Sequence, residues 1–305
     1  MRPRRILPRR RTPSIGVASG VCPYAHAFVN DVVSERDAVA VVITTVCDQM
    51  RRASDVIARD CNLPVFLMNV PSTWQTAAAQ KLYIAELERL GGFMLRLGGK
   101  SPSNDDLRNV MSEYDTARSR LRAARGHLSP RRFSEAIAEF YEDGNSDFDI
   151  GDSIVSTYGV RLALVGGPLP RSDFEIFDVV EDSGGCVVLD ATDNGERTMA
   201  APFERRRLQS EPLIELANAY FGTIPHPFRR PNSELYEWLK RELSERAVQG
   251  IILRRYLWCD IWHAEVQRLK EWTDLPVLDI DVTDDESTGT RTSARIQAFL
   301  DMLKA

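Results

Sequence analysis

"AVAVVITTVCDQMRRASDVIARDCNLPVFLMNV" (residues 38–70) contains the unit from which the fold is built. Residues 38–46 are apolar or β-branched without interruption, which predicts a strand buried on both faces. A helix is expected over 51–59, and residues 63–70 predict a second strand. Strand, helix and strand in this order indicate a parallel sheet joined by a crossover helix.

The alternation continues along the chain after a purely helical stretch. Residues 73–99 predict a long helix that the pair Gly98-Gly99 ends. Residues 101–158 contain only helical patterns, which begin with capping residues in "SPSNDD" and "SPRRF". Strand patterns separated by helical ones then return at 160–169, 185–193, 249–260 and 275–283. We therefore expect an α/β protein with a basic arm (1–20), a first α/β domain (21–100), a helical insert (101–158) and a second α/β domain (159–305).

Length and charge narrow the class of protein. A chain of 305 residues is long enough for two domains. The net charge of −5 argues against a nucleic-acid-binding protein. No stretch approaches the roughly 18–20 apolar residues that span a bilayer, so no membrane insertion is expected.

The N-terminal segment "MRPRRILPRRRT" is a local exception, with six Arg in its first eleven residues. An export signal, a polyanion-binding arm and a contact with an acidic partner are alternatives to a solvated, frayed arm. The following "PSIGVASGV" is too short and too weakly apolar for a signal sequence. The frayed arm is the preferred interpretation, and a cytoplasmic location is expected.

The cysteines are too few for a disulfide scaffold and none has CxxC spacing; they are Cys22, Cys47, Cys61, Cys186 and Cys259. The two halves repeat one scheme, in which a buried strand is followed by Cys-Asp, a helix, "LPV" and another strand. Cys47-Asp48 and Cys259-Asp260 thus follow equivalent strands, at the sheet edge where α/β proteins bind ligands. We expect the halves to face each other across a cleft.

Three of these thiols precede helices. Cys22, in "CPYAHAFVNDVV", lies before an amphipathic helix, as do Cys47 and Cys259, and helix N-termini favour thiolate. An iron–sulfur cluster suits three such thiolates. Alternatives are buried hydrophobic cysteines, a nucleophile paired with His26 or His263, and a zinc site completed by His226. Cys61 and Cys186 are expected at the opposite edge of the sheet, in structural roles.

Two further stretches remain ambiguous. "LVGGPLPRSDF" lacks the Lys of a P-loop and the third Gly of a Rossmann fingerprint, so it is either a tight turn or a close backbone approach to a ligand. "RRYLWCDIWHAEV" gathers Tyr256, Trp258 and Trp262 around Cys259, where they either shield a cluster from water or pack between domains.

The ordered set "CPYAHAFVNDVV", "TTVCDQMRR", "LPVFLMNVPSTWQTAAAQKLYIAELERL", "WCDIWHAEVQRL", "LPVLDIDV" and "TRTSARIQAFLDML" resembles the 2-hydroxyacyl-CoA dehydratase component D family. That family also contains the cluster subunits of benzoyl-CoA reductase and the double-cubane cluster proteins. The resemblance runs from Cys22 to the C-terminus. It implies two flavodoxin-like (Rossmann-like) domains with a 4Fe-4S cluster between them, bound through Cys22, Cys47 and Cys259.

The resemblance also implies an activity and partners. A separate ATP-dependent iron–sulfur activator injects one electron, which yields a ketyl radical that expels the 2-hydroxyl of an acyl-CoA in an anaerobic, redox-neutral elimination. The chain would be a lyase subunit paired with a paralogous subunit or with itself. Alternatives are an acyl-CoA reductase subunit of the benzoyl-CoA type, a double-cubane reductase and a non-catalytic partner subunit.

The chain departs from the family pattern near its start. Residues 1–21 before Cys22 lack the "E…YAAG"-type stretch of the family, and His26 stands where Arg is more usual. The acyl-CoA pocket is therefore expected to differ more than the cluster site. Four residues close in sequence to the cysteines are candidate helix caps or groups that contact the cluster ligands: Asp48, Asp260, His26 and His263. No general base is assigned.

Overall fold

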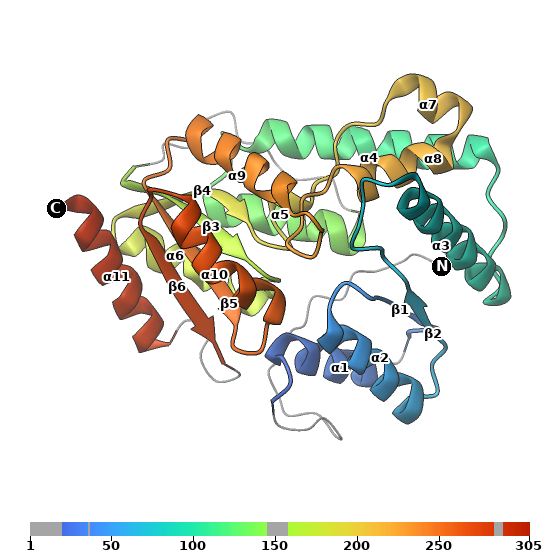
Figure 1. Ribbon diagram of the computed structural model, residues 1–305, viewed down its shortest axis with the longest axis horizontal. Coiled ribbons are helices and arrows are strands. Elements are labelled where there is room, and N and C mark those ends of the chain that lie inside the picture. The colour runs from blue at the N-terminus through green and yellow to red at the C-terminus, as the bar shows by residue number, and fades with distance from the viewer. Residues whose placement is uncertain (1–19, 36, 145–157, 284–288) are drawn as a thin grey trace.

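The computed structural model describes residues 20–35, 37–144, 158–283 and 289–305. It confirms an α/β architecture, with two separate parallel sheets flanked by helices (Figure 1). Nearly all of the basic arm lies outside the described residues, as do residues 145–157 at the end of the expected insert. No helix in the described ranges is long and apolar enough to cross a membrane.

The first sheet pairs two short strands, β1 (Val41–Thr44) and β2 (Val65–Met68), in parallel. Helices α1 (Pro23–Ser34) and α2 (Asp48–Asp60) pack on one face, where Val41 and Ile43 of β1 are buried. Helix α3 (Ala77–Arg96) packs against Phe66 and Met68 of β2 on the other face.

Strand β1 is not buried on both faces, and the expectation from its apolar sequence was wrong. Val41 and Ile43 are buried, whereas Val42 between them is 44% exposed. This alternation is that of a strand covered on one side. The reason is that α3 packs over β2, so the side of β1 that carries Val42 and Thr44 stays open.

The second sheet has four parallel strands in the order β4-β3-β5-β6. They are β3 (Val160–Gly166), β4 (Gly185–Ala191), β5 (Gly250–Tyr256) and β6 (Val277–Val282). The chain leaves β3 toward β4 on one side and later returns to place β5 and β6 on the other. The carboxyl ends of β3 and β5 therefore form a topological switch point, where open α/β sheets bind ligands.

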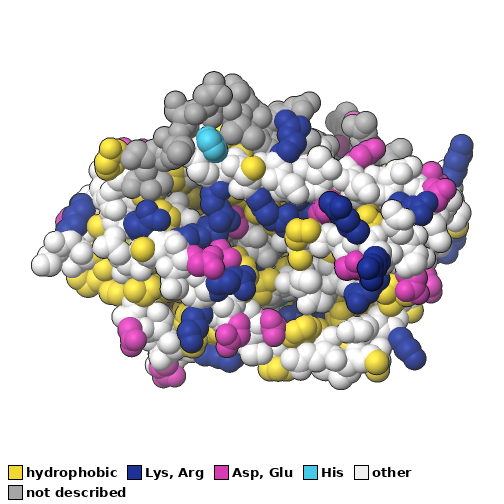
Figure 2. Space-filling view, turned by 90° about the horizontal axis from the view of Figure 1, so that it is seen from above, with side chains coloured by type: hydrophobic (Ala, Val, Ile, Leu, Met, Phe, Trp, Pro, Cys, Tyr) yellow, Lys and Arg dark blue, Asp and Glu magenta, His cyan; other side chains and the backbone are white. Residues whose placement is uncertain are grey.

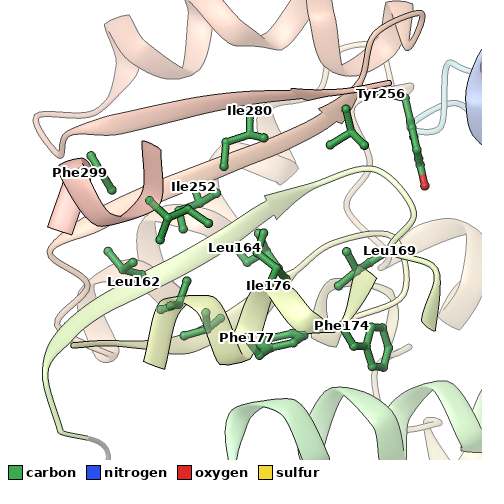
Figure 3. Packing of buried hydrophobic residues seen from close by; sticks show 14 of the residues in the cluster. Leu162, Leu164, Leu169, Phe174, Ile176, Phe177, Ile252, Tyr256, Ile280 and Phe299 are labelled. Atoms are coloured by element: carbon green, nitrogen blue, oxygen red, sulfur yellow. The ribbon is translucent and has the colours of Figure 1, made fainter. Parts of the chain in front are cut away.

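Both faces of this sheet are covered by helices. On one face, α6 (Glu175–Asp182) and α11 (Thr290–Lys304) pack against the strands. Figure 3 shows this cluster, which includes Leu162, Leu164, Ile176, Phe177, Ile252, Ile280 and Phe299. On the opposite face lie α9 (Ser233–Glu245) and α10 (Asp260–Trp272). Each fully buried Leu, Ile or Phe contributes about 1.5–3 kcal/mol, so this sheet supplies most of the hydrophobic stabilisation.

The expected insert consists of α4 (Asn104–Ala124) and α5 (Pro130–Asp143). Ser103 and Asp106 form a capping box at the start of α4, and the Ser129 hydroxyl caps α5. The sequence-based expectation of two capped helices here is confirmed.

Segments from the second half return to pack on this helical region. They are α7 (Arg205–Ser210), α8 (Pro212–Ala217) and a π-helical turn at Asn218–Gly222. Met111 of α4 packs with Ala200, Phe203 and Ala219, and the buried Arg118 donates to the Tyr220 hydroxyl at 2.9 Å. Figure 1 shows α8 between α3 and α4. The helical region is therefore built jointly by two distant parts of the chain, which the sequence did not predict.

The surface seen from above is polar. Lys and Arg side chains intermingle there with Asp and Glu, and hydrophobic side chains form only small groups (Figure 2). Charges of both signs on one face agree with the nearly balanced totals of 39 basic and 44 acidic residues.

Candidate functional site

Cys47 and Cys259 occupy equivalent positions, as the sequence predicts. Each lies at a corner, by which we mean the point where the chain turns into a helix and the cysteine is the N-cap residue. Each follows a strand, β1 or β5, and is the N-cap residue of the next helix, α2 or α10. The main-chain carbonyl of Cys47 accepts from Arg51 N–H at 3.0 Å, and that of Cys259 accepts from His263 N–H at 2.8 Å. The corner is therefore the same local structure in both sheets.

Cys22 provides a third corner of the same kind. It is the N-cap residue of α1 and is followed by Pro23, whose missing N–H suits the first turn of a helix. Its own N–H donates to Gln49 Oε1 at 3.3 Å. Because Gln49 lies two residues after Cys47, this hydrogen bond ties two of the three corners together.

The three thiols line one cavity of about 340 Å³ between the two sheets. The walls are mostly apolar, and among the lining residues are Ala25, Val46, Met50, Val70, Ile224 and Ile261. Cys61 and Cys186 are not among them: Cys61 ends α2 and Cys186 lies at the start of β4. The fold thus brings together the predicted three cysteines and separates the other two.

Burial outweighs the helix N-termini in setting the protonation of the thiols. Burial raises the pKa of Cys47, although the N–H groups of Met50 and Gln49 act in the opposite direction. Burial also raises the pKa of Cys259 to about 12. The main-chain N–H of Trp262 lowers this pKa, whereas the neighbouring Cys22 and Cys47 raise it. The expectation of favoured thiolates was therefore wrong for Cys47 and Cys259 of the metal-free chain. Cys22 and Cys47 thus lie close enough to Cys259 to act on its pKa.

A single metal ion does not fit this arrangement. A tetrahedral zinc would draw thiolates to within about 3.8 Å of each other. Among the described residues, no three Cys, His, Asp or Glu side chains are grouped closely enough to hold one ion. The zinc site considered for His226 is therefore not formed. If the chain holds a larger polynuclear group, the three thiols that line one cavity are the residues that would bind it.

His226 nevertheless lines the cavity. It belongs to the loop that precedes α9. Its Nδ1 accepts from Phe228 N–H at 3.0 Å, which leaves the proton of the neutral ring on Nε2. Asp193 Oδ1 lies 3.7 Å from Nε2, too far for a hydrogen bond. Burial, with Arg197 and Arg229 nearby, holds the pKa of His226 well below its usual range. The imidazole is thus neutral, with Nε2–H as its donor.

Arg229 is a buried cation on the same cavity. It donates to Pro71 O at 3.3 Å and Phe221 O at 2.9 Å, and its guanidinium lies 4.3 Å above the Phe221 ring. No carboxylate of the described residues forms an ion pair with it, and burial lowers its pKa to about 10. By contrast, Arg197 behind the wall pairs with Asp193.

Trp262 contributes a second donor. It is 2% exposed and lines the cavity, and its indole Nε1–H has no hydrogen-bond partner among the described residues. Its ring lies against Gly167, where a Cβ atom would come within 3.3 Å of Trp262 Cδ1. The sequence placed Trp262 near Cys259 but gave it only shielding or packing roles.

The remaining candidate residues do not line the thiol cavity. Asp48 and Asp260 begin α2 and α10 and line a second, more polar pocket of about 430 Å³ outside Cys47. Asp48 pairs with Arg51 at 3.2 Å, and His263 is exposed on α10. His26 lies in α1 and is not among the cavity residues. A Cys nucleophile with a His26 or His263 partner is therefore not supported.

Gly166, the last residue of β3, closely approaches the neighbouring strand β5, and the proposed approach to a ligand stays a prediction. A Cβ atom on Gly166 would lie 1.9 Å from Arg254 O of the neighbouring strand. Pro168, two residues on, lines the cavity. Of the functional residues, sequence reasoning missed Gln49, Asp193 and Arg229, because no local pattern distinguishes them from surface polar residues.

Comparison with known families covers nearly the whole chain. Residues 13–303 match the protein family described as 2-hydroxyglutaryl-CoA dehydratase, D-component. No curated protein sequence matches the chain.

Proposed function

Because the chain belongs to the 2-hydroxyglutaryl-CoA dehydratase D-component family, we propose that it is the cluster-binding subunit of a 2-hydroxyacyl-CoA dehydratase. In this proposal Cys22, Cys47 and Cys259 bind a 4Fe-4S cluster. The enzyme would be a lyase that removes water from a 2-hydroxyacyl-CoA.

The observation that carries the proposal is the convergence of three cysteine corners on one cavity. Each sulfur belongs to a helix N-cap residue, and main-chain N–H groups of Gln49, Met50 and Trp262 lie against the sulfurs of Cys47 and Cys259. N–H donors near thiolates stabilise the excess negative charge of an iron–sulfur site. Because burial raises the pKa of Cys47 and Cys259, cluster binding would release protons from these thiols.

The chain's own residues supply the rest of the site. When bound, a cluster with three protein ligands supplies one-electron transfer and an open iron position. The apolar wall formed by residues such as Val46, Met50 and Ile224 would offer water few hydrogen-bond partners near that position. Gln49 joins the Cys22 and Cys47 corners through its hydrogen bond to Cys22 N–H. The donors His226, Arg229 and Trp262 face the same space from the second half of the chain.

Partners are part of the proposal. A D-component implies companion components. We expect a paralogous subunit, or a second copy of this chain, and an ATP-dependent iron–sulfur activator that donates the electron. The exposed side chains of Leu257 and Trp258, beside Cys259, and the polar pocket at Asp48 and Asp260 offer such a protein a surface next to two of the cysteines.

Anaerobic reconstitution with iron and sulfide tests the proposal. We expect about four iron atoms per chain and the broad visible absorbance of a brown iron–sulfur protein. Cys47→Ser should lose most of both, whereas the matched control Cys186→Ser should retain them, because Cys186 lies away from the cavity. Equal iron content in the wild type and Cys47→Ser would contradict the proposal.

A further inference from the structure

Two donors that line the cavity, the indole of Trp262 and the imidazole of His226, are not explained by cluster binding. Trp262 Nε1–H is buried without a partner among the described residues. Leaving a buried N–H unsatisfied costs about 1–3 kcal/mol. The Nε1 edge of the ring lies near Gly167, where a Cβ atom would be 3.6 Å from it, and the side chain lines the cavity, so a ligand atom there would supply the missing acceptor.

His226 presents a second N–H to the same cavity. Phe228 N–H occupies its Nδ1 at 3.0 Å, so the tautomer with the proton on Nε2 is fixed by the main chain. Asp193 Oδ1 is 3.7 Å away and already accepts from Arg197. The Nε2–H therefore remains available to a ligand.

The two donors belong to one continuous wall. The Arg197 guanidinium lies 5.4 Å above the Trp262 ring and pairs with Asp193, which in turn neighbours His226. Asp193 N–H also donates to Gly167 O at 3.2 Å, and Gly167 lies against Trp262. Arg229 adds a positive charge close enough to lower the pKa of His226. The wall thus combines the neutral N–H donors of Trp262 and His226 with the positive charges of Arg197 and Arg229. Such an environment suits an oxygen atom that accepts hydrogen bonds.

We propose that Trp262 and His226 are positioning residues that bind the 2-hydroxyl oxygen of the acyl-CoA substrate. This inference rests on the proposed function, since it places the acyl group in the cavity with the three cysteines. A hydroxyl oxygen has two lone pairs and can accept from both N–H groups at once. An acyl group without the hydroxyl leaves both donors unsatisfied, and sites of this kind discriminate strongly against the analogue that lacks the group.

A binding site for the 2-hydroxyl oxygen is expected in a dehydratase but not in an aromatic acyl-CoA reductase. A dehydratase substrate carries the oxygen that the donors would hold, and that oxygen leaves as water. The substrate of an aromatic acyl-CoA reductase has no hydroxyl at this position. The unsatisfied Trp262 donor therefore favours the dehydratase.

Equilibrium binding tests the inference without turnover. The cluster-loaded chain is titrated anaerobically, with no activator, with 2-hydroxybutyryl-CoA and with butyryl-CoA, which differ only in the hydroxyl. We expect the wild type to bind the hydroxy thioester at least about tenfold more tightly, since one satisfied buried donor is worth about 1–3 kcal/mol. Trp262→Phe keeps the ring and removes the donor, so most of this preference should disappear.

Matched variants separate the donors from general effects. Trp258→Phe changes an exposed tryptophan next to Cys259 that does not line the cavity, and it should keep the preference. His226→Phe should weaken the preference, and His226→Gln, which retains an N–H donor, should restore part of it. Iron content and melting temperature check that each variant still folds and carries the cluster.

The outcomes are distinct. A cluster-loaded wild type that binds both thioesters equally overturns the inference and leaves the proposed function standing. If Trp262→Phe alters the visible spectrum but keeps the full preference, the indole belongs to the cluster and the inference is wrong. If the wild type holds no iron, or holds the cluster but binds neither thioester, the proposed function fails and the inference fails with it.

Discussion

Gln49 Oε1 accepts a hydrogen bond from the main-chain N–H of Cys22 at 3.3 Å. The two residues are 27 positions apart, yet this contact joins the turn after β1 to the start of α1. Because Cys47 lies two residues before Gln49, this contact links two cysteine corners, in addition to the packing of α1 on α2.

Gln49→Leu should loosen the cysteine site. The substitution keeps the side-chain size but leaves the N–H of buried Cys22 without its acceptor, at a cost of about 1–3 kcal/mol. We expect a lower free energy of unfolding for the cluster-free chain and faster iron loss to a chelator from the loaded chain. Gln80→Leu, on the exposed side of α3, is the control. Unchanged chelation kinetics in Gln49→Leu would show that the contact does not hold the site.

Asp173→Asn should destabilise the fold strongly. Asp173 and Arg254 form a buried ion pair in which both side chains are 1% exposed. Removing one partner of such a pair costs about 3–5 kcal/mol, because the other charge stays buried. Arg254 also donates to Pro168 O at 3.2 Å, so the cavity wall should loosen as well. Urea unfolding measures the loss. Asp60→Asn, which breaks an exposed pair with Arg59, should change stability little.

Three glycine substitutions should give three different results. Gly166→Ala places a methyl group against the main chain of β5 and should destabilise by several kcal/mol, because φ is +153° and Arg254 O would be 1.9 Å away. Gly167→Ala contacts only the Trp262 side chain at 3.3 Å and should cost less. Gly91→Ala in α3 meets nothing within 4 Å and should stabilise by about 0.5–1 kcal/mol. Thermal unfolding of the three variants gives the order.

His226 should make the cluster-free chain less stable in mild acid. Its pKa is lowered in the folded chain, so below about pH 6.5 the unfolded chain binds a proton that the folded chain does not. Stability from this group is therefore present above pH 6.5 and is lost as the pH falls. We expect about 1 kcal/mol of loss between pH 7 and pH 5.5.

Denaturant titrations at the two pH values check this expectation. The loss should be smaller by that amount in His226→Gln. An equal acid loss in the wild type and His226→Gln would mean that other groups account for it.

The helix-forming and strand-forming patterns predicted most elements close to their observed bounds. The strand expected at 160–169 is β3 (Val160–Gly166), and the one expected at 275–283 is β6 (Val277–Val282). Such elements are local: buried parallel strands have continuous apolar runs, and capping residues mark helix starts. The prediction failed at β1, because whether a strand is covered depends on where a distant helix packs.

The sequence by itself determined that three cysteines precede helices and that two follow equivalent strands, because these relations depend only on order and periodicity along the chain. Tertiary structure alone decided that their sulfurs share one cavity, that burial raises rather than lowers the pKa of Cys47 and Cys259, and that His226, Arg229 and Trp262 face them. The physical reason is that proximity and desolvation arise between segments some two hundred residues apart. No local pattern records which polar side chain will be buried without a partner.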